Sequence, residues 1–183
     1  MTVAVEDGLV EALLARVRDV PDFPKPGIVF KDITPMLADH TTFTAAVAAL
    51  AAPFRDAGVD VVAGIEARGF VLGAPVALTL GAGFALVRKK GKLPGTTVAT
   101  SYDLEYGSAT LEVTSDAFMP GARVLVVDDV LATGGTAAAT VELVRRCGAE
   151  VVGMSMLMEI GFLNGRAALE AVGISDPHLL LSV

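Results

Sequence analysis

Acidic, hydroxyl and glycine residues follow one another at one point in the chain. Asp128 and Asp129 come directly after the apolar run 124–127, and residues 133–136 read Thr-Gly-Gly-Thr. Glycines let a backbone approach a ligand closely, and threonine hydroxyls and N–H groups at a helix start can donate to one phosphate. Paired carboxylates suit vicinal sugar hydroxyls or a hydrated Mg²⁺. This order of residue types favours a site for a phosphorylated sugar over an ordinary glycine-rich turn with two surface acids.

The surrounding sequence places this motif between a strand and a helix. The run 124–127 has no polar alternation, which is typical of a strand buried on both faces of a parallel sheet, and residues 137–141 favour a helix. Parallel sheets bind ligands at such strand-to-helix turns. The chain contains no Gly-Lys-Ser or Gly-Lys-Thr triplet, so a Walker A loop is excluded, and the three spaced glycines of a dinucleotide fingerprint are missing here.

Two other segments offer cations at the ends of predicted strands. Arg68 follows the predicted strand 59–63, at the start of a helix whose dipole disfavours a cation, so we favour an anion ligand over a surface role. Four cations follow the predicted strand 83–87: Arg88, Lys89, Lys90 and Lys92. Such a cluster is often a solvated face, but at the carboxyl end of a parallel strand in an acidic protein it indicates a polyphosphate clamp.

Composition limits the class of protein. The 183 residues are 53% hydrophobic and 19% charged, as expected for one globular domain spanning residues 1–183. No apolar run reaches the length of a membrane helix and the first residues lack a basic segment, so we expect a cytoplasmic protein without a membrane partner. A net charge of −7 argues against nucleic-acid binding. Cys147 is the single cysteine, which excludes an internal disulfide and a cysteine cluster for zinc.

The elements that would position these residues alternate along the chain. We expect an amphipathic helix ended by Pro21, a proline-rich extended arm over residues 22–35, and a helix capped by Thr41 or Thr42 and ending near Gly58. Further predicted segments are a hairpin (97–102 and 109–113) with a polar tip that can act as a lid, strands 151–157 and 179–181, and a short helix 165–171. This pattern predicts an α/β fold: a doubly wound, mostly parallel sheet with flanking helices, a β-hairpin lid and a small N-terminal hood of about residues 1–40.

Five segments together carry a resemblance to a known family. They read DFPKPGIVFKDITPML, EARGFVLGAPVA, RKKGKLPG, SYDLEYG and VVDDVLATGGT, and they span about residues 20–160. The last of them resembles the diphosphate signature of the type I phosphoribosyltransferases, and the arm and SYDLEYG are similar to the adenine branch of that family. The resemblance implies purine salvage: formation of AMP and pyrophosphate from adenine and 5-phospho-α-D-ribose 1-diphosphate, with Mg²⁺, by a homodimer.

The resemblance also implies a role for individual residues. Glu105 would hydrogen-bond adenine N7 and act as general acid or base, with Tyr106 beside it in the substrate site. The adenine site would be lined by Val29, Phe30 and Lys31, with the ring of Phe30 stacking on the base. The diphosphate would be met, partly across the dimer, by Arg68, Arg88, Lys89 and Lys92. The ribose hydroxyls would contact Asp128 and Asp129, and the 5-phosphate would bind to Ala132, Thr133, Gly134, Gly135 and Thr136. Mg²⁺ would arrive on the diphosphate and reach Asp128 and Asp129 through water, without direct protein ligands.

One residue departs from the family pattern, and two other functions are alternatives to the adenine enzyme. Some family members have arginine in place of Lys31, whose ammonium lacks the planar fork of a guanidinium. The pair Glu66-Ala67 aligns with a loop that often holds a non-proline cis peptide. A transferase for another base, such as xanthine or orotate, would lack SYDLEYG and the arm. A regulatory binding protein on the same fold would need a DNA-binding extension or a basic face, whereas the N-terminal segment is short and acidic.

Overall fold

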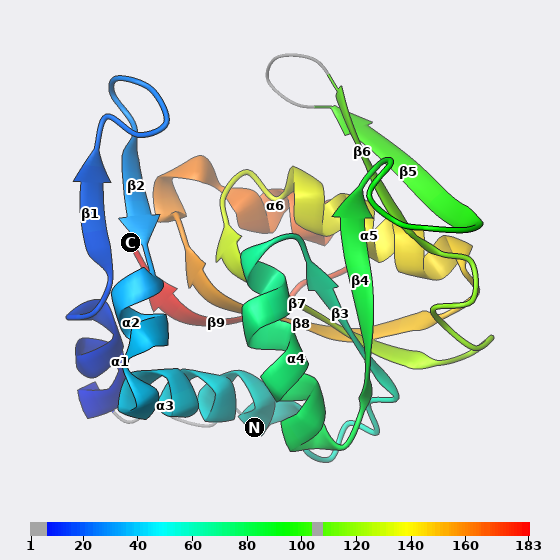
Figure 1. Cartoon of the computed structure of the whole chain (residues 1–183), viewed down its shortest axis with the longest axis horizontal. Coiled ribbons are helices and arrows are strands. Elements are labelled where there is room, and N and C mark those ends of the chain that lie inside the picture. The colour runs from blue at the N-terminus through cyan, green and yellow to red at the C-terminus, as the bar shows by residue number, and fades with distance from the viewer. Residues whose placement is uncertain (1–6, 104–107) are drawn as a thin grey trace.

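A seven-stranded sheet forms the centre of the computed structural model, which describes residues 7–103 and 108–183. The strand order is β5-β6-β4-β3-β7-β8-β9. Five strands are parallel: β3 (Val61–Ile65), β4 (Gly83–Lys89), β7 (Arg123–Leu131), β8 (Glu150–Glu159) and β9 (His178–Ser182). The antiparallel hairpin of β5 (Thr97–Asp103) and β6 (Ser108–Thr114) adds an edge to β4. The predicted α/β class with a mostly parallel sheet is confirmed (Figure 1).

Helices cover both faces of this sheet. One face packs against α1 (Asp7–Leu14), α2 (Thr34–Ala38), α3 (His40–Ala51) and α4 (Arg68–Leu80), and the other against α5 (Gly135–Arg146) and α6 (Gly165–Ala171). In the central strand β7, Leu125 and Val127 are fully buried on the first face, and Val124 and Val126 are fully buried on the second. This double burial explains the unbroken apolar run in the sequence. None of the helices in the described ranges is long and apolar enough to cross a bilayer.

The N-terminal region differs from the prediction. The first helix ends at Leu14 instead of continuing to Pro21, and the proline-rich arm is a hairpin in which β1 (Arg18–Pro21) pairs antiparallel with β2 (Val29–Asp32). Opposite charges on the two strands stabilise it, since Arg18 contacts Asp32 and Lys31 contacts Asp19. Figure 1 shows this hairpin and the β5–β6 hairpin projecting on the same side of the sheet.

The second helical region begins and ends earlier than the sequence suggested. The carboxylate of Asp39 caps α3 by accepting from the Thr42 backbone N–H at 2.9 Å, while the Thr42 hydroxyl donates to the Met36 carbonyl at 3.0 Å. Thr42 therefore joins α2 to α3 instead of capping. The α-helix ends at Ala51 because Pro53 lacks an N–H, and the short 3-10 helix η1 (Ala52–Phe54) follows. A second 3-10 turn, η2 (Gly161–Leu163), precedes α6.

Candidate active site

The acid pair lies within β7, not after it. The ladder with β8 continues from Asp128 opposite Met156 to Leu131 opposite Glu159, so the strand extends beyond the predicted end at residue 127. Asp129 is 5% exposed and Asp128 is partly exposed. The pairing with β8 holds both backbones rigid, and the carboxylates are thereby fixed at the carboxyl edge of the sheet.

The glycines of the TGGT loop have separate functions in the backbone. Gly134 caps α5 with φ +82°, a left-handed conformation that favours glycine, and Gly135 begins the helix. The main chain of Gly165, at the start of α6, lies so close to Ala132 and Gly134 that a methyl group on either glycine would overlap the other segment. The start of α6 therefore sets the position of the loop. The first N–H groups of α5 have no partner inside the helix and open toward the loop.

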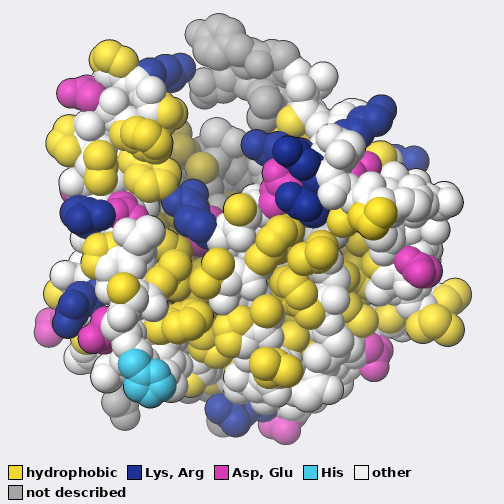
Figure 2. Space-filling model, viewed as in Figure 1, with side chains coloured by type: hydrophobic (Ala, Val, Ile, Leu, Met, Phe, Trp, Pro, Cys, Tyr) yellow, Lys and Arg dark blue, Asp and Glu magenta, His cyan; other side chains and the backbone are white. Residues whose placement is uncertain are grey.

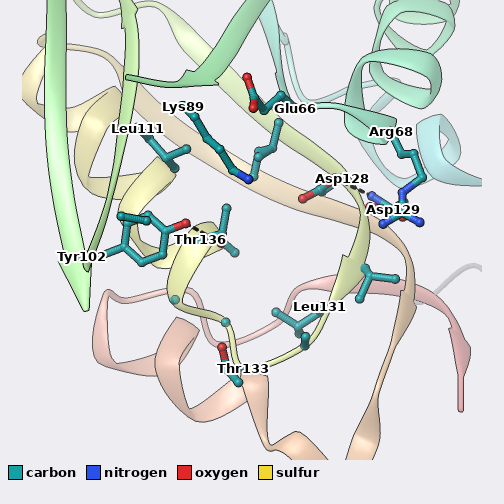
Figure 3. Close-up of a pocket in the computed structure, with 17 residues that line it drawn as sticks. Glu66, Arg68, Lys89, Tyr102, Leu111, Asp128, Asp129, Leu131, Thr133 and Thr136 are labelled. Carbon is teal, nitrogen blue, oxygen red and sulfur yellow. Dashed lines mark hydrogen bonds and ion pairs between the residues drawn. The ribbon is translucent and has the colours of Figure 1, made fainter. Parts of the chain in front are cut away.

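A cavity of about 530 Å³ brings most of these groups together (Figure 3). Its lining includes the predicted site residues Arg68, Lys89, Asp128 and Asp129 and the whole loop 132–136. The lining also contains residues that were not predicted to bind substrate, namely Ile65, Glu66, Tyr102, Ala109, Leu111, Val130, Leu131 and Ala137. Its volume lies within the usual range for a small-molecule site.

Three charged side chains in this cavity, those of Arg68, Asp128 and Asp129, lie close enough to affect one another. The Nε atom of Arg68 lies 2.8 Å from Oδ2 of Asp129, but the two groups are not aligned as a hydrogen bond. Within residues 7–103 and 108–183, this buried oxygen accepts no hydrogen bond from any other group. Burial and the neighbouring Asp129 carboxylate raise the pKa of Asp128 well above its usual value, although the Asp129 N–H, which donates to Asp128 at 2.8 Å, and Arg68 act in the opposite direction. The site thus offers acceptor oxygens that new donors, such as sugar hydroxyls, would satisfy.

Tyr102 is a cavity residue that the sequence analysis missed. Its phenol oxygen lies 2.9 Å from the Thr136 hydroxyl, which links β5 to the TGGT loop (Figure 3). Arg146 of α5 holds the same strand by donating to the Ala99 carbonyl at 2.8 Å and the Thr100 hydroxyl at 3.0 Å. Strand alternation could have predicted that Tyr102 faces inward. In β5 this alternation places Val98, Thr100 and Tyr102 on the face that packs against the core.

Comparison with known proteins gives the family. Residues 34–168 match the family model described as a phosphoribosyl transferase domain. An adenine phosphoribosyltransferase of a Nocardioides species is 64% identical over 172 residues, covering 92% of each chain. The chain belongs to the adenine phosphoribosyltransferases. The crystal structure of such an enzyme from Rhodothermus marinus superposes with a TM-score of 0.90 at 50% identity, covering 96% of this chain and 99% of that one. A Saccharomyces cerevisiae enzyme, complexed with an imino-altritol bisphosphate and adenine, has a TM-score of 0.85 at 36% identity, with 94% and 97% covered.

Other residues expected to bind the diphosphate in an adenine phosphoribosyltransferase lie beside the cavity instead of in its lining. Arg88 contacts Glu66 with its Nε at 3.1 Å and donates from Nη1 to the Lys92 carbonyl at 3.1 Å. Its guanidinium therefore braces the turn that carries Lys92. The side chain of Glu66 is held in this contact, and the Glu66–Ala67 peptide is cis.

The residues expected to bind the base lie on β2. Val29, Phe30 and Lys31 do not line the cavity, but the Arg68 guanidinium lies 4.9 Å from the centre of the Phe30 ring, which joins the arm to the cavity. The Lys31 ammonium contacts Asp19 at 2.8 Å, so this side chain is engaged within the hairpin. Glu105 and Tyr106 lie outside the described residues, and their assignments stay predictions.

The residues present suit a metal ion that arrives with the substrate. Within the described parts of the chain, no three or more His, Cys, Asp or Glu side chains are grouped to hold a metal directly. Asp128 and Asp129 are two hard oxygen ligands at the edge of the cavity, and Oδ2 of Asp129 lacks an aligned donor. Mg²⁺ retains several waters and commonly binds to one or two carboxylates together with substrate phosphates. The pair therefore fits water-mediated contact with a Mg-diphosphate.

Proposed function

We propose that this chain transfers the 5-phosphoribosyl group from 5-phospho-α-D-ribose 1-diphosphate to adenine, giving AMP and pyrophosphate in purine salvage. The observation that carries the proposal is a single cavity lined by the TGGT loop, the Asp128–Asp129 pair and the cations Arg68 and Lys89. These are the groups needed for a phosphate, vicinal hydroxyls and a diphosphate. The identity of 64% to a curated adenine phosphoribosyltransferase supports the choice of base.

The reaction divides among these groups according to charge. The loop residues Ala132, Thr133, Gly134, Gly135 and Thr136 bind the 5-phosphate, and the two acids accept hydrogen bonds from the ribose hydroxyls. As the C1–O bond breaks, negative charge develops on the departing pyrophosphate and positive charge on the sugar. Cations fixed beside the leaving group stabilise this charge where it appears. The residues in that role are Arg68, Arg88, Lys89 and Lys92, and bound Mg²⁺ supplies further neutralisation of the diphosphate.

The nucleophile is adenine N9, whose bond to C1 replaces the broken C1–O bond. Val29, Phe30 and Lys31 hold the base, with the Phe30 ring against its face. Glu105, with Tyr106 beside it, takes or shares the proton that adenine loses, a role supported by the family resemblance of SYDLEYG. We expect Glu105→Leu to lower kcat by roughly 10² and Glu105→Gln to retain more activity, because an amide can still hydrogen-bond the base. Steady-state kinetics with both substrates measures this, and a Leu variant with unchanged kcat would remove Glu105 from the chemistry.

A spectrophotometric assay tests the activity directly. Purified protein with Mg²⁺ and phosphoribosyl diphosphate is offered adenine, hypoxanthine, guanine and xanthine separately, and product nucleotides are identified by chromatography. We expect AMP from adenine and at least 10²-fold lower rates with the oxopurines, because a site that pairs an amino group leaves polar groups unpaired with an oxo base. Equal or higher rates with another base would contradict the adenine assignment. Absence of any nucleotide product would contradict transferase activity.

We also propose a homodimer, which is supported by an apolar surface. Figure 2 shows hydrophobic side chains gathered over the face of α4 and β4. There Leu78 is 82% exposed, Val71 43% and Leu86 40%. An exposed patch of this kind indicates an interaction surface, and a two-fold dimer is the commonest arrangement. We expect Leu78→Asp to shift the sedimentation equilibrium toward monomer, whereas Met119→Asp, at an exposed residue in the loop before β7, should not. A wild-type monomer would contradict the proposal.

The cytoplasmic location stays a prediction.

A further inference from the structure

Glu112 is a buried carboxylate beneath the turn that carries the lysine cluster. It lies on β6, opposite Arg88 of β4, and is 4% exposed. Its Oε1 accepts the backbone N–H groups of Lys92 at 2.9 Å and Leu93 at 3.0 Å, and Oε2 lies 3.3 Å from the donating Thr97 hydroxyl. One side chain therefore satisfies two consecutive backbone N–H groups of the turn and one hydroxyl.

Consecutive N–H groups that converge in this way form an anion-binding concavity. Here the protein's own carboxylate occupies it. Burial alone would raise the pKa of Glu112, but the donors of Leu93, Lys92 and Thr97 outweigh burial and hold the pKa below its ordinary value of 4.5. Glu112 is thus ionised at neutral pH, and its contacts are charge-assisted hydrogen bonds, which are stronger than neutral ones.

Further hydrogen bonds fix the backbone of the same turn. The Lys90 N–H donates to the Thr110 carbonyl at 3.0 Å, and Arg88 holds the Lys92 carbonyl from the opposite side. Because the backbone is fixed at Lys90, Lys92 and Leu93, the lysine side chains leave it from defined positions near the carboxyl end of β4. In Figure 2 basic side chains surround acidic ones in this region. Lys89, directly before the turn, lines the cavity.

We propose that Glu112 is a positioning residue for the diphosphate: it acts through the backbone of Lys92 and Leu93 to hold the lysine-bearing turn in the conformation that meets the leaving group. The proposal rests on the proposed function, because it takes the turn to be the diphosphate site. Glu112 touches no substrate in this account. Its charge is stabilised by hydrogen bonds from backbone N–H groups, so the lysine ammonium groups are not needed to pair with it. A cation held in place stabilises developing charge without reorganising, whereas a loose turn would have to order itself on binding.

The test separates positioning from simple stabilisation of the fold. Glu112→Met fills the same volume and accepts no comparable hydrogen bond, and Glu112→Gln keeps a neutral acceptor for the N–H groups. The matched control is Thr110→Ala, which removes the 2.9 Å hydroxyl contact with Ser101 on the same hairpin and leaves the turn's backbone contacts in place. For each purified full-length variant, KM for both substrates, kcat, the melting temperature and calorimetric binding of Mg-pyrophosphate are measured.

We expect Glu112→Met to raise KM for phosphoribosyl diphosphate and Kd for pyrophosphate by about 10-fold or more, with Glu112→Gln raising both by about 3-fold, as for a weaker acceptor. KM for adenine, measured at saturating diphosphate, should stay within about 2-fold in both variants. Thr110→Ala should lower the melting temperature without changing either constant. A Glu112→Met protein with lowered melting temperature but wild-type KM and Kd would overturn the proposal. If that variant does not fold, unchanged constants in Glu112→Gln would overturn it. Wild-type protein that neither binds pyrophosphate nor forms AMP would instead refute the proposed function.

Discussion

A methyl group at Gly69 tests how closely the site depends on the packing of α4 against β7. Gly69 is the second residue of α4 and is buried, and an added Cβ would lie 2.8 Å from Oδ1 of Asp128 and 2.9 Å from the Val127 carbonyl oxygen. Ordinary contact begins near 3.4 Å, so the methyl group is about 0.6 Å too close to the carboxylate. The Val127 carbonyl belongs to the central strand and cannot rotate away. The helix start, with Arg68, or the acid side chain must therefore move.

The effect on activity follows from the size of this displacement. A misplacement of about 1 Å in a catalytic site can cost on the order of 10²-fold, so a shift of about half that size in Asp128 or Arg68 is expected to lower kcat/KM for phosphoribosyl diphosphate about 10-fold. Overpacking of this kind costs about 1–3 kcal/mol of unfolding free energy, which exceeds the roughly 1 kcal/mol by which alanine improves on glycine within a helix. Gly69→Ala should therefore be less active and somewhat less stable.

Steady-state kinetics and thermal unfolding check both expectations. The matched control is Gly8→Ala, also at the second position of a helix, where an added Cβ would meet no atom within 4 Å. That variant should keep wild-type kinetics and show no loss of stability. If Gly69→Ala has wild-type kcat/KM and a raised melting temperature, the contact between Gly69 and Asp128 does not constrain the site, and the reasoning fails.

The site and the core support four further predictions. Asp128→Asn and Asp129→Asn should each lower kcat/KM for phosphoribosyl diphosphate about 10-fold in steady-state assays, since each replaces one of two carboxyl oxygens by an amide group that cannot accept a hydrogen bond. Because the pKa of Asp128 is raised in the fold, ionisation costs stability as pH rises through that pKa, so Asp128→Asn should also raise the melting temperature at pH 8. Tyr102→Phe should raise KM for the same substrate by about 3-fold with unchanged KM for adenine, because it removes the contact with Thr136; equal changes in both constants would contradict this. Burial lowers the pKa of His178, so the stability from its neutral form is present above the unfolded value of 6.5 and is lost as pH falls through the folded pKa. The loss of melting temperature between pH 7.5 and 5.5 should be smaller in His178→Gln.

Much of the sheet and the centre of the site could be predicted from sequence because their signals are local. The unbroken apolar run before Asp128, the TGGT turn and the alternation of the β5–β6 hairpin each lie within a few residues, and each occurs where the sequence placed it. The cation turn was likewise placed at the end of β4. Periodicity and turn chemistry act over this range, so they succeed where one element determines its own conformation.

The predictions failed where residues distant in the sequence determine the local structure. Residues 15–20 continue an acceptable helical pattern, but the chain leaves the helix after Leu14, and residues 18–21 form a strand because they pair with β2. The contacts of Arg18 and Lys31 across the hairpin support this pairing. The contact between Tyr102 and Thr136 joins residues 34 apart, and Glu112 accepts from a turn about twenty residues away. The roles of Gly69 and Gly165 depend on neighbouring backbones that no local pattern reveals. Sequence identified the charged groups, and tertiary packing determined which of them are engaged with one another.

Arg68 connects the two halves of the proposed reaction. Its guanidinium contacts Asp129 on the ribose side of the cavity and lies over the Phe30 ring of the arm expected to hold the base. The ion pair uses Nε, and a guanidinium carries further N–H groups on its two terminal nitrogens. The same side chain can therefore meet a diphosphate while it remains near Asp129, which a lysine ammonium on a flexible stem would not do with the same geometry. A bound diphosphate would compete with Asp129 for the Arg68 guanidinium. Hydrogen bonds donated by the ribose hydroxyls to Asp129 would compensate for the weaker ion pair. On this argument the acids, Arg68 and the arm respond to one substrate as a coupled set, which is why a displacement as small as the one expected from Gly69→Ala should be measurable.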